Sequence, residues 1–295
     1  MGKKSRRKKK SGMSGVGLLI LGASILLIGA GSFMALSSGC SEERGIITDT
    51  PSPTPAPGKP SGIKHYPGLE TVNLPENLAA QTKEYLGFTI SFNKENKTPN
   101  YVAWELLAEE TKGDNPRSNN FWSDPDLEGC PTTKDYTNSG FDRGHLCPAA
   151  DQKWSQQAMS DCFVMGNICP QDHSLNTGAW NTLENKERQW AVRDSAIMIV
   201  AGPIYSASDT QRIGNAGVRV PGAFFKVLAA PYLDEPRGIA FVYPNMKASG
   251  NMENYAMSID ELEKITGFDF FPALPDDVEK KIESAYSFKE WNSSK

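Results

Sequence analysis

The sequence predicts an α+β fold with a central, mostly antiparallel sheet flanked by helices. Three observations carry this prediction. Short apolar segments of strand length recur between residues 87 and 245, turn-forming residues separate neighbouring segments, and a few helical segments are inserted among them. Antiparallel-type strands with inserted helices are typical of the α+β class.

The first strand is expected at residues 87–93, where apolar and polar residues alternate as in a half-buried strand. A polar turn, NKENK, joins it to a second strand at residues 98–108. Later strands are expected at residues 141–147, 163–171, 197–205, 224–232 and 238–245. The last two form a pair.

Three segments show helical patterns. Residues 155–161 have helical periodicity, and residues 258–267 begin with Ser258, carry acids in the first turn and end at Gly267. The longest helix begins near Ser174. Its apolar face, which we assign to the core, consists of Trp180, Leu183 and Trp190.

Residues 109–140 are rich in Gly, Pro, Asn and Asp and contain Arg117. No strand or helix pattern runs through them, so the sequence predicts a long loop. Loops of this length are usually functional or disordered.

The chain begins with a basic segment followed by an apolar one. Residues 1–12 contain seven Lys/Arg and no acid, and residues 13–40 contain no charged side chain. The apolar stretch at 15–36 is long enough to span a hydrocarbon core of about 30 Å. Positive charge before such a span predicts a basic cytoplasmic head at residues 1–12 and a membrane segment at 13–40.

Two interpretations of residues 13–40 stay open. They form an uncleaved signal anchor, or a lipoprotein signal in which small residues precede a lipid-modified Cys40. The basic run could also bind nucleic acid or direct nuclear import, but the adjoining apolar span disfavours this. Both membrane interpretations predict a membrane-anchored protein whose folded domain is extracytoplasmic, in the periplasm or at the cell surface.

Residues 41–64 are rich in Pro, Ser, Thr and Gly, which cannot form a packed core. We therefore expect an extended linker there and one folded domain over residues 65–290.

Downstream of residue 40 the chain carries 24 Lys/Arg against 35 Asp/Glu, a net charge of −11. A domain that held nucleic acid by its overall charge would be basic. Any contact with nucleic acid must therefore come from a local cationic patch, which disfavours a pure binding module.

Four cysteines follow Cys40, namely Cys130, Cys147, Cys162 and Cys169. No pair has the C-x-x-C spacing of a zinc site, and in an oxidising compartment four cysteines allow three pairings. We favour a disulfide between Cys147 and Cys169, because both flank the motif described next.

One short segment brings together the groups needed to hydrolyse a phosphodiester bond. His145 is a general base near neutral pH, and the side-chain oxygen of Asn176 is a ligand for Mg²⁺. Glu184 lies eight residues after Asn176, about 80° around an ideal helix, where it could orient the waters of the ion. Arg143 and Arg117 would bind phosphate oxygens.

The chain resembles the DNA/RNA non-specific endonucleases of the Serratia nuclease and mitochondrial endonuclease G type. The resemblance covers about residues 65–275 and includes TPNYVAWEL at 98–106 and FFKVL at 224–228. The other matching segments are Asp142–His145, Trp154–Ser155, Asn167–Gln171 and Leu175–Glu184, and the first of these is specific only in combination with the last two.

This resemblance implies a ββα-metal active site in which His145 is the general base and Asn176 the direct ligand of a single Mg²⁺ ion, with Mn²⁺ as a substitute. It implies supporting roles for Arg117, Arg143, Asn167 and Glu184. DNA and RNA would be the substrates, the products would carry 5′-phosphate ends, and a homodimer is implied as well.

Simpler roles compete with these assignments. His145 could be a core histidine, Asn176 a helix N-cap and Glu184 the ion-pair partner of Arg188 one turn later. Arg143 could be structural, paired with Asp142. The competing function is a membrane-tethered module that captures nucleic acid without cutting it, which the complete base–metal–carboxylate set disfavours.

Overall fold

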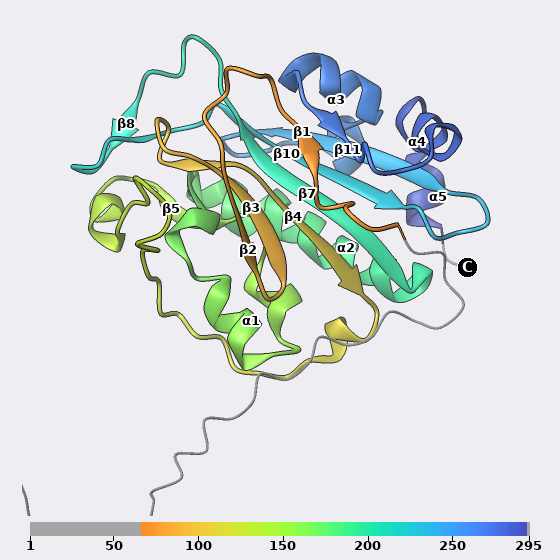
Figure 1. The fold of residues 1–295 in the computed structure, drawn as a ribbon, viewed down its shortest axis with the longest axis horizontal. Helices are drawn as coiled ribbons and strands as arrows, with labels where there is room; N and C mark the ends of the chain where they lie inside the picture. The colour runs from red at the N-terminus through yellow and green to blue at the C-terminus, as the bar shows by residue number, and fades with distance from the viewer. Residues whose placement is uncertain (1–65, 294–295) are drawn as a thin grey trace, which may run out of the picture. The chain divides into compact units, whose positions relative to one another are not determined.

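The computed structural model describes residues 66–293. The predicted basic head, the apolar segment and the linker lie outside the described residues, so their boundaries stay predictions. The fold class is confirmed, since a mostly antiparallel sheet carries helices on both faces (Figure 1).

The central sheet has seven strands in the order β12-β11-β10-β7-β4-β3-β2, and each neighbouring pair is antiparallel. The five strands predicted for it are confirmed within about two residues at each end, as expected for strand boundaries. The strands are β2 (Gln81–Tyr85), β3 (Phe88–Asn93), β4 (Thr98–Leu107), β7 (Ala196–Ile204), β10 (Ala223–Ala230), β11 (Arg237–Pro244) and β12 (Ala256–Met257).

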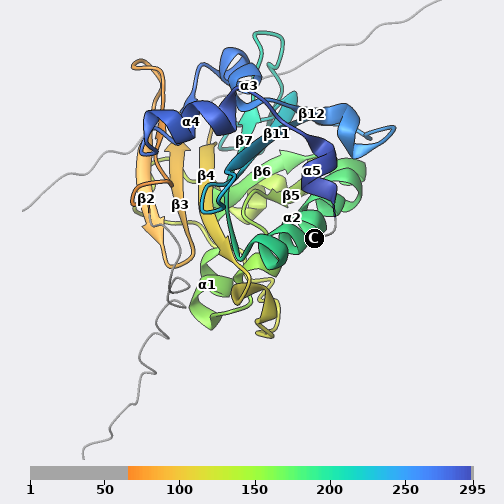
Figure 2. The same cartoon turned by 90° about the vertical axis from the view of Figure 1, so that its right-hand side faces the viewer.

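Side chains of the central strands alternate between two cores. In β4, Val102 and Trp104 belong to one core, whereas Tyr101 and Ala103 belong to the other. This follows from the two-residue period of a strand and explains why both faces are apolar. Figures 1 and 2 show α1 and α2 with β5 on one side of the sheet, and α3 and α4 on the other.

The first face carries the motif segment. β5 (Asp142–His145) pairs antiparallel with β6 (Ile168–Gln171), and a π-helical segment (Leu175–Trp180) then leads into α2 (Asn181–Asp194). This is the ββα arrangement that the resemblance implied. The predicted helix at 155–161 is α1 (Gln156–Asp161), with the Ser155 side chain accepting hydrogen bonds at its N-cap.

A glycine is required at the third position of the Asp-Arg-Gly-His motif because β5 and β6 approach closely there. A Cβ atom on Gly144 would lie 2.3 Å from Oε1 and 2.6 Å from Cβ of Gln171. Any larger residue would therefore push β6 away from His145, the next residue along β5.

The second face is covered by α3 (Ile259–Thr266) and α4 (Asp276–Glu283). α3 begins and ends as predicted, because Ser258 and Glu261 form a capping box and Gly267 takes a left-handed conformation with φ 71°. Neither α4 nor α5 (Phe288–Asn292) was expected from the sequence. The small strands are β1 (Val72–Asn73), paired with β13 (Asp269–Phe270), and β8 (Arg212–Ile213), paired with β9 (Val218–Arg219).

The predicted disulfide is wrong. Cys130, Cys147, Cys162 and Cys169 are all free thiols, and the last three are buried. Burial raises the pKa of the Cys162 thiol to about 12, and it raises the pKa of the Cys169 thiol as well. These cysteines act as small apolar side chains of the core.

Candidate active site

His145 ends β5 and lies almost completely buried, with 8 % of its surface exposed. Its Nε2 atom has no hydrogen-bond partner among the described residues. The pKa of the imidazole is lowered to about 3, mainly by burial and in part by the guanidinium groups of Arg117 and Arg143, while a hydrogen bond with the Arg143 backbone opposes the shift. The ring is therefore neutral near pH 7, and Nε2 is a free proton acceptor.

Two aromatic rings connect His145 to both predicted arginines. The ring centroids of Phe121 and Phe163 lie 5.4 and 4.8 Å from that of His145. The Arg143 guanidinium stacks over Phe121 at 4.4 Å, and the Arg117 guanidinium lies over Phe163 at 4.9 Å. Both arginines are exposed, so two cations flank the buried base and form the local positive patch that the acidic domain requires.

Asn176 is held by the first residue of the motif. Its Nδ2 donates to Oδ2 of Asp142 at 2.8 Å, and Nδ1 of His173 lies 2.9 Å from the same oxygen. Because the amide nitrogen of Asn176 is engaged, its Oδ1 atom is the one left to bind a cation. Asp142 thus orients Asn176. The competing assignment, in which Asp142 pairs with Arg143, is not seen among the ion pairs of the described residues.

The helical spacing assumed between Asn176 and Glu184 does not hold. Residues 175–180 form a π-helical segment in which Gly178 has non-helical dihedrals, φ −104° and ψ −106°. The angle of about 80° applies only to a regular α-helix. The described contacts connect Asn176 to β5 and Glu184 to the sheet below α2, without a direct contact between the two.

Asn167 is fully buried, and its amide group is saturated by backbone partners. Oδ1 accepts from the Cys147 N–H at 2.9 Å, while Nδ2 donates to the carbonyl oxygens of Cys147 and Cys162 at 2.9 and 2.8 Å. The side chain therefore fixes the backbone two residues after His145, and it has no atom left for a substrate.

Glu184 lies in the first turn of α2, with 13 % of its side chain exposed. Burial raises the pKa of its carboxyl to about 7, although Lys226 lies 4.0 Å away and opposes this shift. The competing pairing with Arg188 is not seen, because Arg188 donates to Asp151 at 2.7 Å.

Lys226, for which the sequence pattern predicted no role, connects Glu184 to the rest of the site. It lies on β10 with no exposed surface, pairs with Glu187 at 2.8 Å and stacks over the Trp180 ring at 4.7 Å. Trp180 in turn donates from Nε1 to the His145 carbonyl oxygen at 3.3 Å. Trp180, which precedes α2, and Leu183 and Trp190 within it are all buried, as predicted for the apolar face of this helix.

The side-chain oxygen of Asn176 is a suitable ligand for a hard divalent cation, and the candidate base lies on β5, the strand whose first residue holds Asn176. The free Oδ1 of Asn176 and the unpartnered Nε2 of His145 lie near opposite ends of β5, since Asp142 begins and His145 ends this strand. Oxygen ligands suit Mg²⁺, which keeps several of its waters and so needs few protein ligands.

The comparisons with known proteins agree with this geometry. A family profile described as DNA/RNA non-specific endonuclease matches residues 66–277. The chain is 34 % identical over 218 residues to "Nuclease EXOG, mitochondrial" of Danio rerio, which covers 68 % of this chain and 63 % of that protein. It is 33 % identical over 237 residues to "Endonuclease G, mitochondrial" of Bos taurus, which covers 75 % and 76 %. The chain thus spans less than two thirds of the length of the EXOG relative.

A solved structure is similar as well. The crystal structure of the EndoG/EndoGI complex superposes with a TM-score of 0.62 and 26 % sequence identity, covering 68 % of this chain and 88 % of that one.

The predicted location is contradicted by these comparisons. We expected a membrane-anchored, extracytoplasmic domain, with Cys40 lipidation as one alternative, whereas the relatives just described are mitochondrial nucleases. Within residues 66–293, no helix has the length and apolar character needed to cross a membrane. The apolar segment on which the prediction rested lies outside the described residues.

The family profile spans the whole ββα segment and every candidate site residue from Arg117 to Glu184. More than half of the chain lies within that match, and the fold agrees with that of EndoG. The chain therefore belongs to the DNA/RNA non-specific endonucleases, a family of nuclease enzymes.

Proposed function

We propose that this chain is an endonuclease that hydrolyses phosphodiester bonds of DNA and RNA with a single Mg²⁺ ion and leaves 5′-phosphate ends. The observation that carries the proposal is the neutral, unpartnered Nε2 of His145 between two exposed arginines. A homodimer, which the resemblance implied, stays a prediction.

In this proposal Nε2 of His145 accepts a proton from the attacking water, since a neutral imidazole is a general base at physiological pH. Arg117 and Arg143 bind phosphate oxygens of the substrate. Bound Mg²⁺ would neutralise negative charge that develops on the phosphate and the leaving oxygen. Asn176 would hold the ion through Oδ1, with Asp142 fixing the orientation of the amide.

Glu184 would be a carboxylate that orients water, and Asn167 would position the backbone after His145. Arginine contacts to phosphates carry no information about the bases, so this site would favour neither a particular sequence nor one type of sugar.

The competing function, a binding module without catalysis, is disfavoured, because such a module has no need of a buried neutral base.

Digestion of nucleic acids by the purified full-length chain tests this proposal. We expect plasmid DNA, single-stranded DNA and RNA all to be degraded with Mg²⁺ or Mn²⁺ and to stay intact with EDTA. The 5′ ends of the products should accept a radiolabel from a kinase only after phosphatase treatment. Binding without cleavage in both metals would favour the capture module instead.

The metal assignment has its own control. Asn176→Ala should raise the Mg²⁺ concentration for half-maximal cleavage by about tenfold or more, because the proposed ligand oxygen is lost. Asn185→Ala removes an exposed amide further along α2 and should leave that concentration unchanged.

The pH dependence of cleavage distinguishes Glu184 from His145. Burial raises the pKa of the Glu184 carboxyl to about 7, so its carboxylate form is lost as the pH falls below that value. We expect kcat/KM to fall by about tenfold per pH unit below pH 7. His145 cannot cause this decline, because its pKa is about 3.

Glu184→Gln should cleave more slowly than the wild type above pH 7 and should show no decline as the pH falls through 7. A decline of the same size in that variant would assign the titration to another group.

A further inference from the structure

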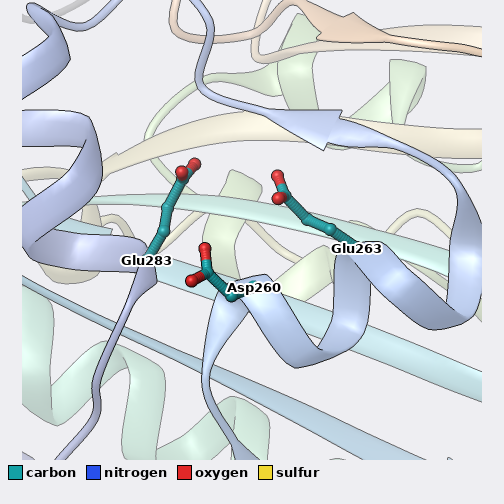
Figure 3. Close-up of side chains that lie close together, drawn as sticks. All are labelled: Asp260, Glu263 and Glu283. Atoms are coloured by element: carbon teal, nitrogen blue, oxygen red, sulfur yellow. The ribbon is translucent and has the colours of Figure 1, made fainter.

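Three carboxylates meet on the face of the sheet opposite His145. Asp260 and Glu263 lie three residues apart on α3, and Glu283 is the last residue of α4. One oxygen atom from each lies within 4.8 Å of the others. Figure 3 shows the three side chains directed into a common space between the two helices.

Glu283 is buried there, and one of its carboxylate oxygens has no hydrogen-bond partner among residues 66–293. The residue is 7 % exposed, and the oxygen without a partner is Oε1. None of the ion pairs formed by residues 66–293 involves Asp260, Glu263 or Glu283. A buried carboxylate with an unsatisfied oxygen destabilises a fold unless a proton or a cation neutralises it.

The surroundings make the cluster more negative still. Burial and, after it, the nearby carboxylates of Glu263, Glu279, Asp260 and Asp269 together raise the pKa of the Glu283 carboxyl to about 9. Glu283 also ends α4, where the helix dipole is negative and favours a cation over an anion. The neighbouring carboxylates and the C-terminal end of α4 therefore favour a positive ligand.

We propose that Asp260, Glu263 and Glu283 bind a divalent cation of the Ca²⁺ class that holds α3 against α4. Ca²⁺ binds oxygen at about 2.3–2.6 Å, so two of its ligands can lie up to about 5 Å apart. That span accommodates the 4.8 Å within which the three oxygens lie. Mg²⁺ binds at about 2.0–2.1 Å and retains more of its waters, so it fits the cluster less well.

This site is separate from the nuclease site. The residues of α3 and α4 that face the sheet, Ile259, Leu262 and Ile282, belong to one core, whereas Leu183 and Trp190 of α2 belong to the other. The central sheet separates these two cores, with α3 and α4 on one side and α2 on the other (Figure 2). The cation would stabilise the α3–α4 layer and takes no part in cleavage.

Thermal unfolding of the full-length chain in EDTA and in CaCl₂ tests the proposal. At a Ca²⁺ concentration a hundredfold above the Kd, we expect the Tm to rise by roughly 5–10 °C. Equal concentrations of MgCl₂ should raise it much less. Asn176→Ala should keep the full Ca²⁺ response, which separates this site from the proposed metal ligand of the nuclease site.

Glu283→Gln keeps the size of the side chain, removes its charge and should abolish the response. Glu279→Gln makes the same charge change on the same helix, outside the three ligands, and should retain the response. If Glu283→Gln fails to fold, Asp260→Asn tests the same site from α3.

Two results would overturn the proposal. In the first, Ca²⁺ leaves the Tm of the wild type unchanged while Glu283→Gln raises it in EDTA, which would mean that the carboxyls share a proton. In the second, Ca²⁺ stabilises Glu283→Gln and Asp260→Asn as strongly as the wild type, which would place the ion elsewhere.

Discussion

We expect His145→Ala to lower kcat/KM for DNA cleavage by about 10²- to 10⁴-fold, the usual contribution of a general base. The imidazole is a neutral proton acceptor near Arg117 and Arg143, and its Nε2 has no hydrogen-bond partner among residues 66–293. Alanine supplies no acceptor, whereas both arginines remain to bind the substrate. Affinity for a metal-free duplex should therefore stay close to that of the wild type.

Loss of the ring leaves a gap between Phe121 and Phe163, so the unfolding temperature must be measured alongside the rate. His145→Gln fills more of this gap and should be equally inactive. His173→Ala is the matched control, because the imidazole of this exposed histidine lies beside Asp142 and not beside His145, and the change should alter the rate less than about fivefold. Cleavage by His145→Ala at the wild-type rate would refute the proposed base.

Replacing Lys226 with Met should destabilise the folded chain by about 3–5 kcal/mol, the usual cost of removing one partner of a buried ion pair. Lys226 and Glu187 have no exposed surface, and their charged atoms lie 2.8 Å apart. Without the ammonium group, Glu187 and Glu184 would be two buried carboxylates without a cation between them. Denaturant unfolding at pH 7 measures this loss.

A double variant decides whether the charge or the packing matters. Lys226→Met with Glu187→Gln removes both charges and should recover much of the lost stability. Lys94→Met breaks an exposed pair with Glu128 and should leave the free energy of unfolding nearly unchanged. A double variant as unstable as Lys226→Met alone would show that packing dominates.

Much of this fold could be predicted from the sequence, because strands with two buried faces have strong local patterns. Residues 197–205 and 224–232 are almost continuously apolar, and both are central strands. Short polar elements lack such a signal. α4 has the sequence DDVEKKIE, in which only two residues are apolar, and its helix depends on packing against the sheet.

The candidate site was predictable where one residue type suits one chemical role, as for His145 and Asn176. Its supporting contacts were not, since they join distant segments. Phe121 and Phe163 occupy separate segments, and only the tertiary fold stacks them against His145. The ion pair of Lys226 likewise depends on the tertiary fold. Its burial toward α2 had one signal in the sequence, because Phe224 and Leu228 lie two residues away on either side and therefore share its face of β10.

The side chains of β10 alternate between the two cores, and this pattern also favours the correct register of β10 with its neighbouring strands. Lys226 faces the core that contains Trp180, and its neighbours Phe225 and Val227 face the core under α3. A slip of β10 by one residue would turn the lysine into that second core, away from Glu187, and would bury an unpaired charge. The lysine that supports Glu184 thus also penalises misaligned forms of the sheet during folding.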